Sequence, residues 1–253
     1  MADLPEEVDV VVIGGGVMGA SAAFHLAEAG VSVLLVEKNE LASGSTSKAA
    51  GGVRANFSDE LNIAMGARSL DLLADFPNRP GQEIDLHRPG YMFALSTQED
   101  VELFEKSTAL HLAAGVESRM LTPQEAKELN PLLEIDGILA ASFTPNDGYC
   151  TPESVVLGYA SGARKHGAIV MTHTEATGIE IVDGQIVSVT TSAGTVKTKT
   201  VINCAGAWSP TIGEMVGLEI PVKPLRRELL ITEPLTADFA DVPENMPMTI
   251  DYS

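Results

Sequence analysis

Three glycines near the start of the chain, Gly14, Gly16 and Gly19, have the spacing of a turn that holds phosphate groups. They follow the apolar run of residues 8–13 and precede a helix-like segment at residues 20–26. The first glycine permits a tight turn, the second lets the backbone approach a pyrophosphate, and the third allows close helix–strand packing. The free amides that open the helix favour an anion. The sequence therefore predicts a pyrophosphate site at this turn.

An acidic residue, Glu37, ends a second apolar run about 20 residues further on. Its carboxylate is placed to accept hydrogen bonds from a ribose diol. A plain βαβ unit with a glycine-rich turn is the alternative. Because strand, turn, helix and acid follow in the expected order, we predict that the chain binds a dinucleotide.

The elements that must position these residues can be read from periodicity and turn signals. Residues 8–36 are predicted to form strand, helix and strand, and residues 38–56 a long loop of the kind that usually has a function. Further helices are expected over residues 58–76 (capped by Ser58 or Asp59), 97–115 and 151–166, with a short helix opened by the capping box of residues 122–125. Further strands are expected over residues 91–96, 137–143, 168–172, 175–182, 185–192, 201–204 and 222–232.

These elements indicate two domains threaded through each other rather than placed in series. Nucleotide-type βαβ elements occupy residues 1–84 and 146–219. A second sheet is expected in residues 85–145 and 220–253.

The composition narrows the class of protein. The net charge of -19 argues against nucleic acid and anionic membranes as partners. No apolar run approaches the roughly 18 residues of a membrane span. The N-terminus is acidic and lacks the features of a secretory signal. The two cysteines, Cys150 and Cys204, cannot form a metal cluster, and Cys204 is expected to be a buried small hydrophobe. We expect a protein of the reducing cytoplasm with no metal site.

Three ordered segments carry a more specific resemblance. They are the glycine turn with Glu37-Lys38, the loop that contains Gly44-Ser45-Thr46-Ser47-Lys48, and the later run Ala205-Gly206-Ala207-Trp208. Together they resemble the FAD-dependent amino acid and amine oxidoreductases of the D-amino acid oxidase, glycine oxidase and sarcosine oxidase family, especially its sarcosine oxidase beta-type and proline dehydrogenase-type members. The resemblance implies an α/β fold in which a Rossmann-like FAD-binding domain of the glutathione reductase type is interleaved with a mixed-sheet substrate domain.

The resemblance also implies which residues hold FAD. The glycine turn would cradle the pyrophosphate, Glu37 would hold the adenosine ribose, and residues 44–46 would wrap the phosphate–ribityl region. Ala176 would lie at the adenine, and Trp208 would close over the cofactor, with a core or interface aromatic as the alternative. The full expected set of cofactor contacts is Gly14, Gly16, Val17, Met18, Gly19, Glu37, Lys38, Gly44, Ser45, Thr46, Ser47, Gly52, Ala176, Ala205, Gly206 and Trp208.

Two loop residues bear on how the flavin is attached. Ser47 and Lys48 stand where relatives often carry histidine or arginine, and in some relatives a histidine there anchors the flavin covalently. Because neither residue is histidine here, FAD should be held non-covalently. Lys48 would place a positive charge near the flavin, and an exposed loop lysine is the alternative.

Arg54 is the candidate for substrate binding. The flavin would take a hydride from the carbon beside an amine, so the protein must hold the carboxylate of the substrate. A guanidinium can bind a carboxylate through two parallel hydrogen bonds. Arg54 also lies where sarcosine oxidase-like members carry a substrate arginine. A surface arginine, or one that contacts the flavin phosphates, is the alternative.

The family continues beyond the point where this chain stops, so we expect an incomplete substrate domain. Its open sheet edge would favour self-association or a completing polypeptide. The leading function is FAD-dependent oxidation of the C–N bond of a small amino acid or secondary amine (sarcosine-, glycine- or proline-like), with oxygen or another carrier as electron acceptor. The alternatives are an FAD-binding fragment or subunit without turnover, and an NAD-dependent dehydrogenase.

Overall fold

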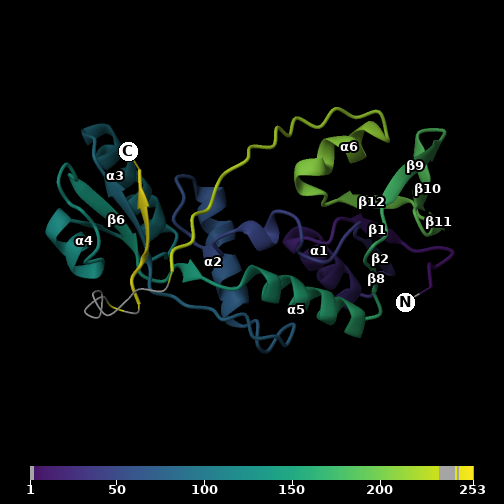
Figure 1. Cartoon of the computed structure of the whole chain (residues 1–253), viewed down its shortest axis with the longest axis horizontal. Coiled ribbons are helices and arrows are strands. Elements are labelled where there is room, and N and C mark those ends of the chain that lie inside the picture. The colour runs from purple at the N-terminus through teal and green to yellow at the C-terminus, as the bar shows by residue number, and fades with distance from the viewer. Residues whose placement is uncertain (1–2, 234–242, 244, 253) are drawn as a thin grey trace. The chain divides into compact units, whose positions relative to one another are not determined.

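The structure is a computed structural model that describes residues 3–233, 243 and 245–252. Its chain forms two compact units, each built from segments far apart in the sequence (Figure 1). Unit 1 comprises Met1–Ala49, Phe76–Ile84 and Thr151–Leu229, and unit 2 comprises Ala50–Asp75, Asp85–Cys150 and Leu230–Ser253. Residues 50–75, which we expected beside the nucleotide-type elements, thus belong to unit 2.

Unit 1 is organised around a parallel sheet. Its strand order is β12 (Thr200–Asn203), β1 (Val10–Ile13), β2 (Val33–Val36) and β8 (Ile169–Met171). β1 and β2 are buried along their whole length, as in parallel sheets covered on both faces. Helices α1 (Val17–Glu28) and α5 (Pro152–Lys165) pack against each other and against these strands (Figure 1). The strand–helix–strand prediction for residues 8–36 is confirmed.

A second, antiparallel sheet completes unit 1. It joins β9 (Ala176–Val182), β10 (Gln185–Thr191) and β11 (Gly194–Lys197). Its inward residues share one apolar core with β1 and β2, where Val11, Leu34, Val189 and Val196 are fully buried. After β12 come a 3-10 turn, η2 (Gly206–Trp208), and the short helix α6 (Ser209–Glu214).

Unit 2 contains a mixed sheet, as expected. Its strand order is β13 (Met248–Asp251), β4 (Tyr91–Leu95), β6 (Ala140–Thr144) and β5 (Arg119–Leu121), with β13 parallel to β4 and the other pairs antiparallel. A two-stranded pair joins β3 (Gly52–Val53) to β7 (Gly148–Tyr149). The helices of the unit are α2 (Glu60–Ala74), α3 (Gln98–Ala113) and α4 (Pro123–Leu129).

Side chains cap these three helices, and the sequence predicted the caps of α2 and α4. Asp59 accepts a hydrogen bond from the amide of Asn62, and Thr97 accepts one from Asp100. Thr122 and Glu125 form the predicted capping box. Each cap satisfies amides that the first helical turn leaves without a backbone partner.

One predicted strand is wrong. Residues 222–232 have no strand pairing in the structure, and Leu230 and Ile231 are each 94% exposed. The segment mixes apolar and β-branched residues with four charged ones, and hydrogen bonds to a neighbouring strand are what make an extended chain a strand. No described strand pairs with this segment, and Pro224 removes one of its amide donors.

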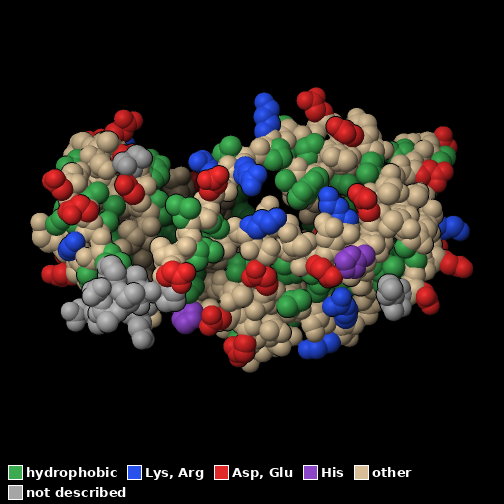
Figure 2. Space-filling model, viewed as in Figure 1, with side chains coloured by type: hydrophobic (Ala, Val, Ile, Leu, Met, Phe, Trp, Pro, Cys, Tyr) green, Lys and Arg blue, Asp and Glu red, His purple; other side chains and the backbone are tan. Residues whose placement is uncertain are grey.

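Two surface properties complete the description. In the part of the chain that the structure describes, no helix combines the length and apolar character needed to cross a bilayer. Asp and Glu side chains are spread over the viewed face of both units rather than gathered in one patch (Figure 2).

Candidate functional site

The glycine turn between β1 and α1 has no room for side chains. Gly14 has φ +112°, and a Cβ there would lie 2.4 Å from the carbonyl oxygen of Cys204. A Cβ on Gly19 would lie 1.8 Å from the carbonyl oxygen of Gly14. The turn, the first helical turn of α1 and the end of β12 are therefore in direct backbone contact, as the glycine spacing predicted.

The N-terminus of α1 is open toward an anion. Gly16 is the N-cap, no side chain caps the helix, and its first turn holds no acidic residue. The amide of Val17 donates to the hydroxyl of Thr46 at 3.2 Å, which brings the loop of residues 44–46 to the helix end. Amides at a helix N-terminus and the helix dipole favour phosphate.

Glu37, just after β2, is held by two backbone amides. Its Oε2 accepts from Gly15 at 2.7 Å and its Oε1 from Asn39 at 2.9 Å. Each carboxylate oxygen can accept further hydrogen bonds, so the group is oriented and still able to bind a diol. Gly15 was not predicted. A Cβ on it would lie 2.8 Å from Cβ of Glu37, so a glycine in the middle of the run of residues 14–16 was the available signal.

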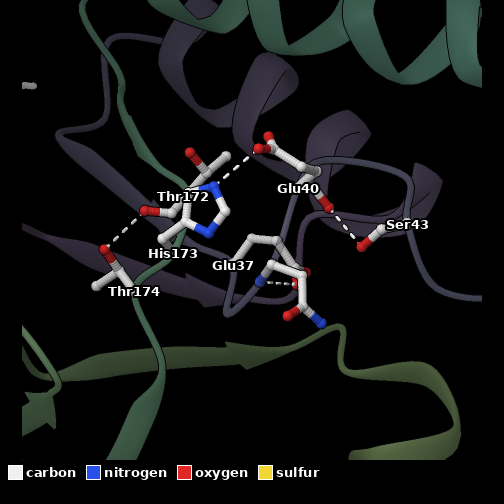
Figure 3. Close-up of polar contacts among 7 residues, drawn as sticks. Glu37, Glu40, Ser43, Thr172, His173 and Thr174 are labelled. Carbon is white, nitrogen blue, oxygen red and sulfur yellow. Dashed lines mark hydrogen bonds and ion pairs between the residues drawn. The ribbon is translucent and has the colours of Figure 1, made fainter.

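Short-range contacts hold the chain segments that follow β2 and β8 side by side (Figure 3). The amide of Thr174 donates to the carbonyl of Glu37 at 2.8 Å. His173 pairs with Glu40 at 2.8 Å, and the hydroxyl of Ser43 donates to the carbonyl of Glu40 at 2.7 Å. The His173–Glu40 pair is well exposed and so adds little stability, but the backbone bonds fix one wall of the site.

These segments enclose a cavity of about 510 Å³ in unit 1. Its size falls within the range of small-molecule and cofactor sites. The sequence-predicted residues that line it are Gly14, Gly16, Val17, Met18, Glu37, Lys38, Gly44, Ser45, Thr46, Lys48, Ala176, Ala205, Gly206 and Trp208. Gly19 and Ser47 do not line it, and Gly52 lies in unit 2. The sequence analysis missed the lining residues Asn39, Cys204, Thr211 and Met215.

Trp208 and Lys38 form one side of this cavity. The Nζ of Lys38 lies 4.5 Å from the centre of the Trp208 ring, within cation–π range. The ring is 48% exposed, so it is not a core aromatic. Cys204, expected to be buried, is partly exposed because it lies at the cavity edge, and desolvation raises the pKa of its thiol.

Arg54 lies in unit 2, beside a second cavity of about 480 Å³. Three aromatic rings surround its guanidinium carbon, with ring centres at 5.1 Å for Phe57 and 5.3 Å for both Tyr91 and Phe93. Within the described ranges, no carboxylate forms an ion pair with Arg54. A half-buried guanidinium held between rings, with no ion pair to a described carboxylate, suits a carboxylate ligand.

The unit 1 cavity fits FAD in its donors and acceptors. It offers free amides and a helix N-terminus for the pyrophosphate, an oriented carboxylate for a ribose, and a wall of small residues where backbone meets ligand. A Cβ at Gly14 or Gly19 would clash with neighbouring backbone, so these glycines allow the close packing of β1, α1 and β12 beside the cavity.

Comparisons with known proteins agree with this site. Over residues 9–252 the chain matches the family described as "DAO: FAD dependent oxidoreductase". Dimethylglycine dehydrogenase of Rattus norvegicus mitochondria is 33% identical over 229 residues, which make up 90% of this chain and 27% of that protein. Glycine oxidase of Geobacillus kaustophilus is 30% identical over 230 residues, 88% of this chain and 61% of that protein.

A solved structure extends the agreement to the fold. L-proline dehydrogenase from P. horikoshii matches with a TM-score of 0.85 and 32% identity, covering 98% of this chain and 65% of that one. The predicted α/β architecture is therefore confirmed, and so is FAD, rather than the alternative NAD, as the cofactor of the family. Having the glycine turn, the oriented Glu37 and a family match over nearly its whole length, the chain belongs to the DAO family of FAD dependent oxidoreductases.

Proposed function

We propose that this chain holds FAD in the unit 1 cavity and contributes Arg54 to an amine or amino acid oxidoreductase. The observation that carries the proposal is the cavity itself, in which a glycine turn, a helix N-terminus and an oriented carboxylate meet. The chain spans only 27% of the dimethylglycine dehydrogenase and 61% of the glycine oxidase it resembles, so its activity is proposed and not inherited from them.

The roles proposed for the cofactor residues follow from their contacts. The amides at the start of α1 bind the pyrophosphate, Glu37 accepts the ribose hydroxyls, and Thr46 orients the loop against the helix end. Lys38 and Trp208 cover one side of the cavity. FAD is held non-covalently, and it supplies the hydride-accepting chemistry when bound.

Arg54 is proposed to bind the substrate carboxylate. Its bidentate guanidinium would fix the substrate in one orientation, and the rings of Phe57, Tyr91 and Phe93 restrict its own movement. Lys48 lines the unit 1 cavity and would add positive charge near the flavin. The substrate class we favour is a small amino acid or secondary amine, such as sarcosine, dimethylglycine, glycine or proline.

Partners and location remain part of the same proposal. Oxygen or another carrier would accept the electrons. Cys150 and Cys204 are both free thiols, which suits a reducing compartment such as the cytoplasm.

Binding of FAD can be measured directly. Trp208 is the single tryptophan of the chain and lines the cavity, so its fluorescence reports on this site alone. We expect saturable quenching by FAD and none by NAD at the same concentration. If neither nucleotide quenches the fluorescence of Trp208, the cavity does not hold FAD.

Turnover is tested by anaerobic absorbance of the FAD-loaded chain with sarcosine, dimethylglycine, glycine, proline and D-amino acids. Bleaching by one of them identifies the substrate, and Arg54→Ala should then raise its half-saturating concentration about a hundredfold. Arg68→Ala, an exposed arginine on α2 in the same unit, is the matched control and should change nothing. Bound flavin that no amine bleaches would mean an FAD-binding subunit without turnover.

A further inference from the structure

We propose that Asp147 is a positioning residue for Arg54, because its buried carboxylate fixes the backbone that carries the guanidinium between its three rings. The inference rests on the proposed role of Arg54 for its functional consequence, but the positioning itself concerns only groups within unit 2.

The carboxylate of Asp147 is almost completely buried in the turn between β6 and β7, with 1% of the residue exposed. Its Oδ1 accepts a hydrogen bond from the amide of Ala55 at 2.9 Å. Its Oδ2 accepts from the amide of Asn56 at 3.3 Å and from the hydroxyl of Thr144 at 2.8 Å. Both amides directly follow Arg54, so the carboxylate fixes the chain at the point where this side chain leaves it.

Thr144 links the carboxylate of Asp147 to β4, the strand that carries two of the three rings. Its hydroxyl lies 3.3 Å from the carbonyl oxygen of Tyr91, and it accepts from the side-chain amide of Asn56 at 3.2 Å. Tyr91 and Phe93 belong to β4, whose register with β6 pairs Tyr91 with Thr144. The Asn56 side chain, the Asp147 carboxylate and the backbone of Tyr91 therefore meet at the same buried hydroxyl.

His111 holds the other end of the same segment. This fully buried histidine on α3 donates from Nε2 to the carbonyl oxygen of Phe57 at 2.7 Å, and its Nδ1 lies 3.1 Å from the hydroxyl of Ser118. Phe57 supplies the third ring around Arg54. Residues 55–57 are thus fixed on both sides by buried polar groups from two other elements.

Burying an ionised carboxylate at this position lowers the stability of the fold. Desolvation raises the pKa of Asp147, and no described cation forms an ion pair with it. What the ionised group provides is acceptor capacity for two successive amides and a hydroxyl at once, which a neutral side chain of the same size cannot match. Two of the three hydrogen bonds that the carboxylate accepts come from the amides that follow Arg54.

The test uses the full chain with FAD and arginine labelled with ¹⁵N at Nε. The Arg54 signal is assigned by its loss in Arg54→Lys. In Asp147→Asn we expect a lower order parameter for the Arg54 Nε–H group, with the Arg68 and Arg119 signals unchanged. Asn146→Ala removes the neighbouring side chain of the same turn, whose only described bond is an exposed one to Glu117, and should leave Arg54 unchanged. An unchanged Arg54 order parameter in Asp147→Asn would overturn the inference.

A second variant keeps the test decisive if Asp147→Asn does not fold. Thr144→Val removes one bond to the carboxylate and the link to β4, and should lower the order of Arg54 in the same direction. If Asp147→Asn does not fold and Thr144→Val leaves Arg54 as rigid as in the parent chain, the inference is overturned as well.

Acetate separates this inference from the proposed function. Titration with acetate should shift the Arg54 signal of the parent chain, and Asp147→Asn should weaken acetate binding at least about fivefold. In an Arg54→Lys background, Asp147→Asn should weaken acetate binding no further. No acetate shift at Arg54 would count against the proposed carboxylate role while the order parameter still decides the positioning. A loss of acetate affinity equally large in both backgrounds would show that Asp147 acts independently of Arg54.

Discussion

The two cavities of this chain are built by different means. The unit 1 cavity is shaped mainly by backbone: glycines, helix amides, and a carboxylate held by amides. The Arg54 cavity of unit 2 is shaped by side chains, with three rings around one guanidinium and a buried carboxylate and imidazole behind it. A backbone site depends on residue types that leave space, whereas a side-chain site depends on contacts between particular groups.

The contrast explains what each site should tolerate. In unit 1 most substitutions that keep the glycines should preserve the cavity, because its donors are main-chain groups. In unit 2 the loss of one buried group should disturb several others, because Asp147, Thr144 and Asn56 share hydrogen bonds.

The largest expected effect is a break in the backbone site. Gly14→Ala would combine a left-handed backbone with a Cβ 2.4 Å from a carbonyl oxygen. The variant should lose about 3 kcal/mol or more of its free energy of unfolding and should not bind FAD. Gly30→Ala also has a positive φ but meets no atom within 4 Å, so it should cost about 1 kcal/mol and leave FAD affinity unchanged. Urea unfolding and Trp208 quenching measure both effects. Equal costs for the two variants would contradict the backbone account.

The next effect tests the one side chain on which the backbone site relies. Glu37→Gln removes the charge that the amides of Gly15 and Asn39 orient, and should weaken FAD binding about tenfold to a hundredfold. Glu40→Gln removes the charge of a neighbouring exposed carboxylate and serves as the matched control, with FAD affinity expected to stay within about twofold. A similar loss in both variants would point to general charge and not to Glu37.

A smaller effect probes the side-chain site through pH. Burial raises the pKa of Asp147 above its ordinary value of 3.8, opposed by its hydrogen bonds and by the nearby His111. The folded chain then holds this proton more tightly than the unfolded chain. The contribution of the Asp147 carboxyl to the free energy of unfolding therefore falls as the pH rises from below 3.8 through the raised pKa. It is constant at higher pH.

Asp147→Asn removes this titration. The variant should be less stable than the parent by about 1 to 2 kcal/mol at neutral pH because one amide loses its acceptor. The difference in the free energy of unfolding between parent and variant should narrow as the pH rises from below 3.8 through the raised pKa of Asp147. Urea unfolding at steps between about pH 3 and pH 7 follows it. A difference that widens with rising pH would show that the folded chain prefers the ionised form.

The smallest effect concerns the side of the cofactor cavity. Lys38→Met keeps most of the length of the side chain but removes its charge from the Trp208 ring. The variant should lose about 0.5 kcal/mol of its free energy of unfolding. The Trp208 emission spectrum should shift in the same variant, since its nearest cation is lost. Lys48→Met removes another cavity lysine that makes no described ring contact, so it should leave the emission unchanged. A shift of the same size in both would reject a specific contact.

The sequence predicted the backbone site far better than the side-chain site. Glycine spacing and the acid at residue 37 are local signals with a direct structural reason, and most residues expected at the cofactor line the unit 1 cavity. Their proposed contacts with FAD stay predictions. Arg54 was singled out from its position, but its surroundings come from β4, α3 and the β6–β7 turn. No spacing rule brings those residues together.

The errors have a similar origin. Short strands such as β3, β5 and β7 were missed because two or three residues carry no readable periodicity. Residues 222–232 were predicted as a strand from composition, but pairing is a property of a partner elsewhere in the fold. The helix caps of α2 and α4 were predicted well, because a cap and the amide it binds lie within three residues of each other.

The pairing of β1 with β12 has a consequence for synthesis. Val10 is paired with Thr200, so β1 has an open edge until residues 200–203 have left the ribosome. β4 likewise waits for β13, which pairs Tyr91 with Met248. Non-local pairs of this kind slow folding because the intervening chain must be closed first. Neither sheet is complete until β12 and β13 have been made, so the nascent chain exposes two open strand edges that favour association.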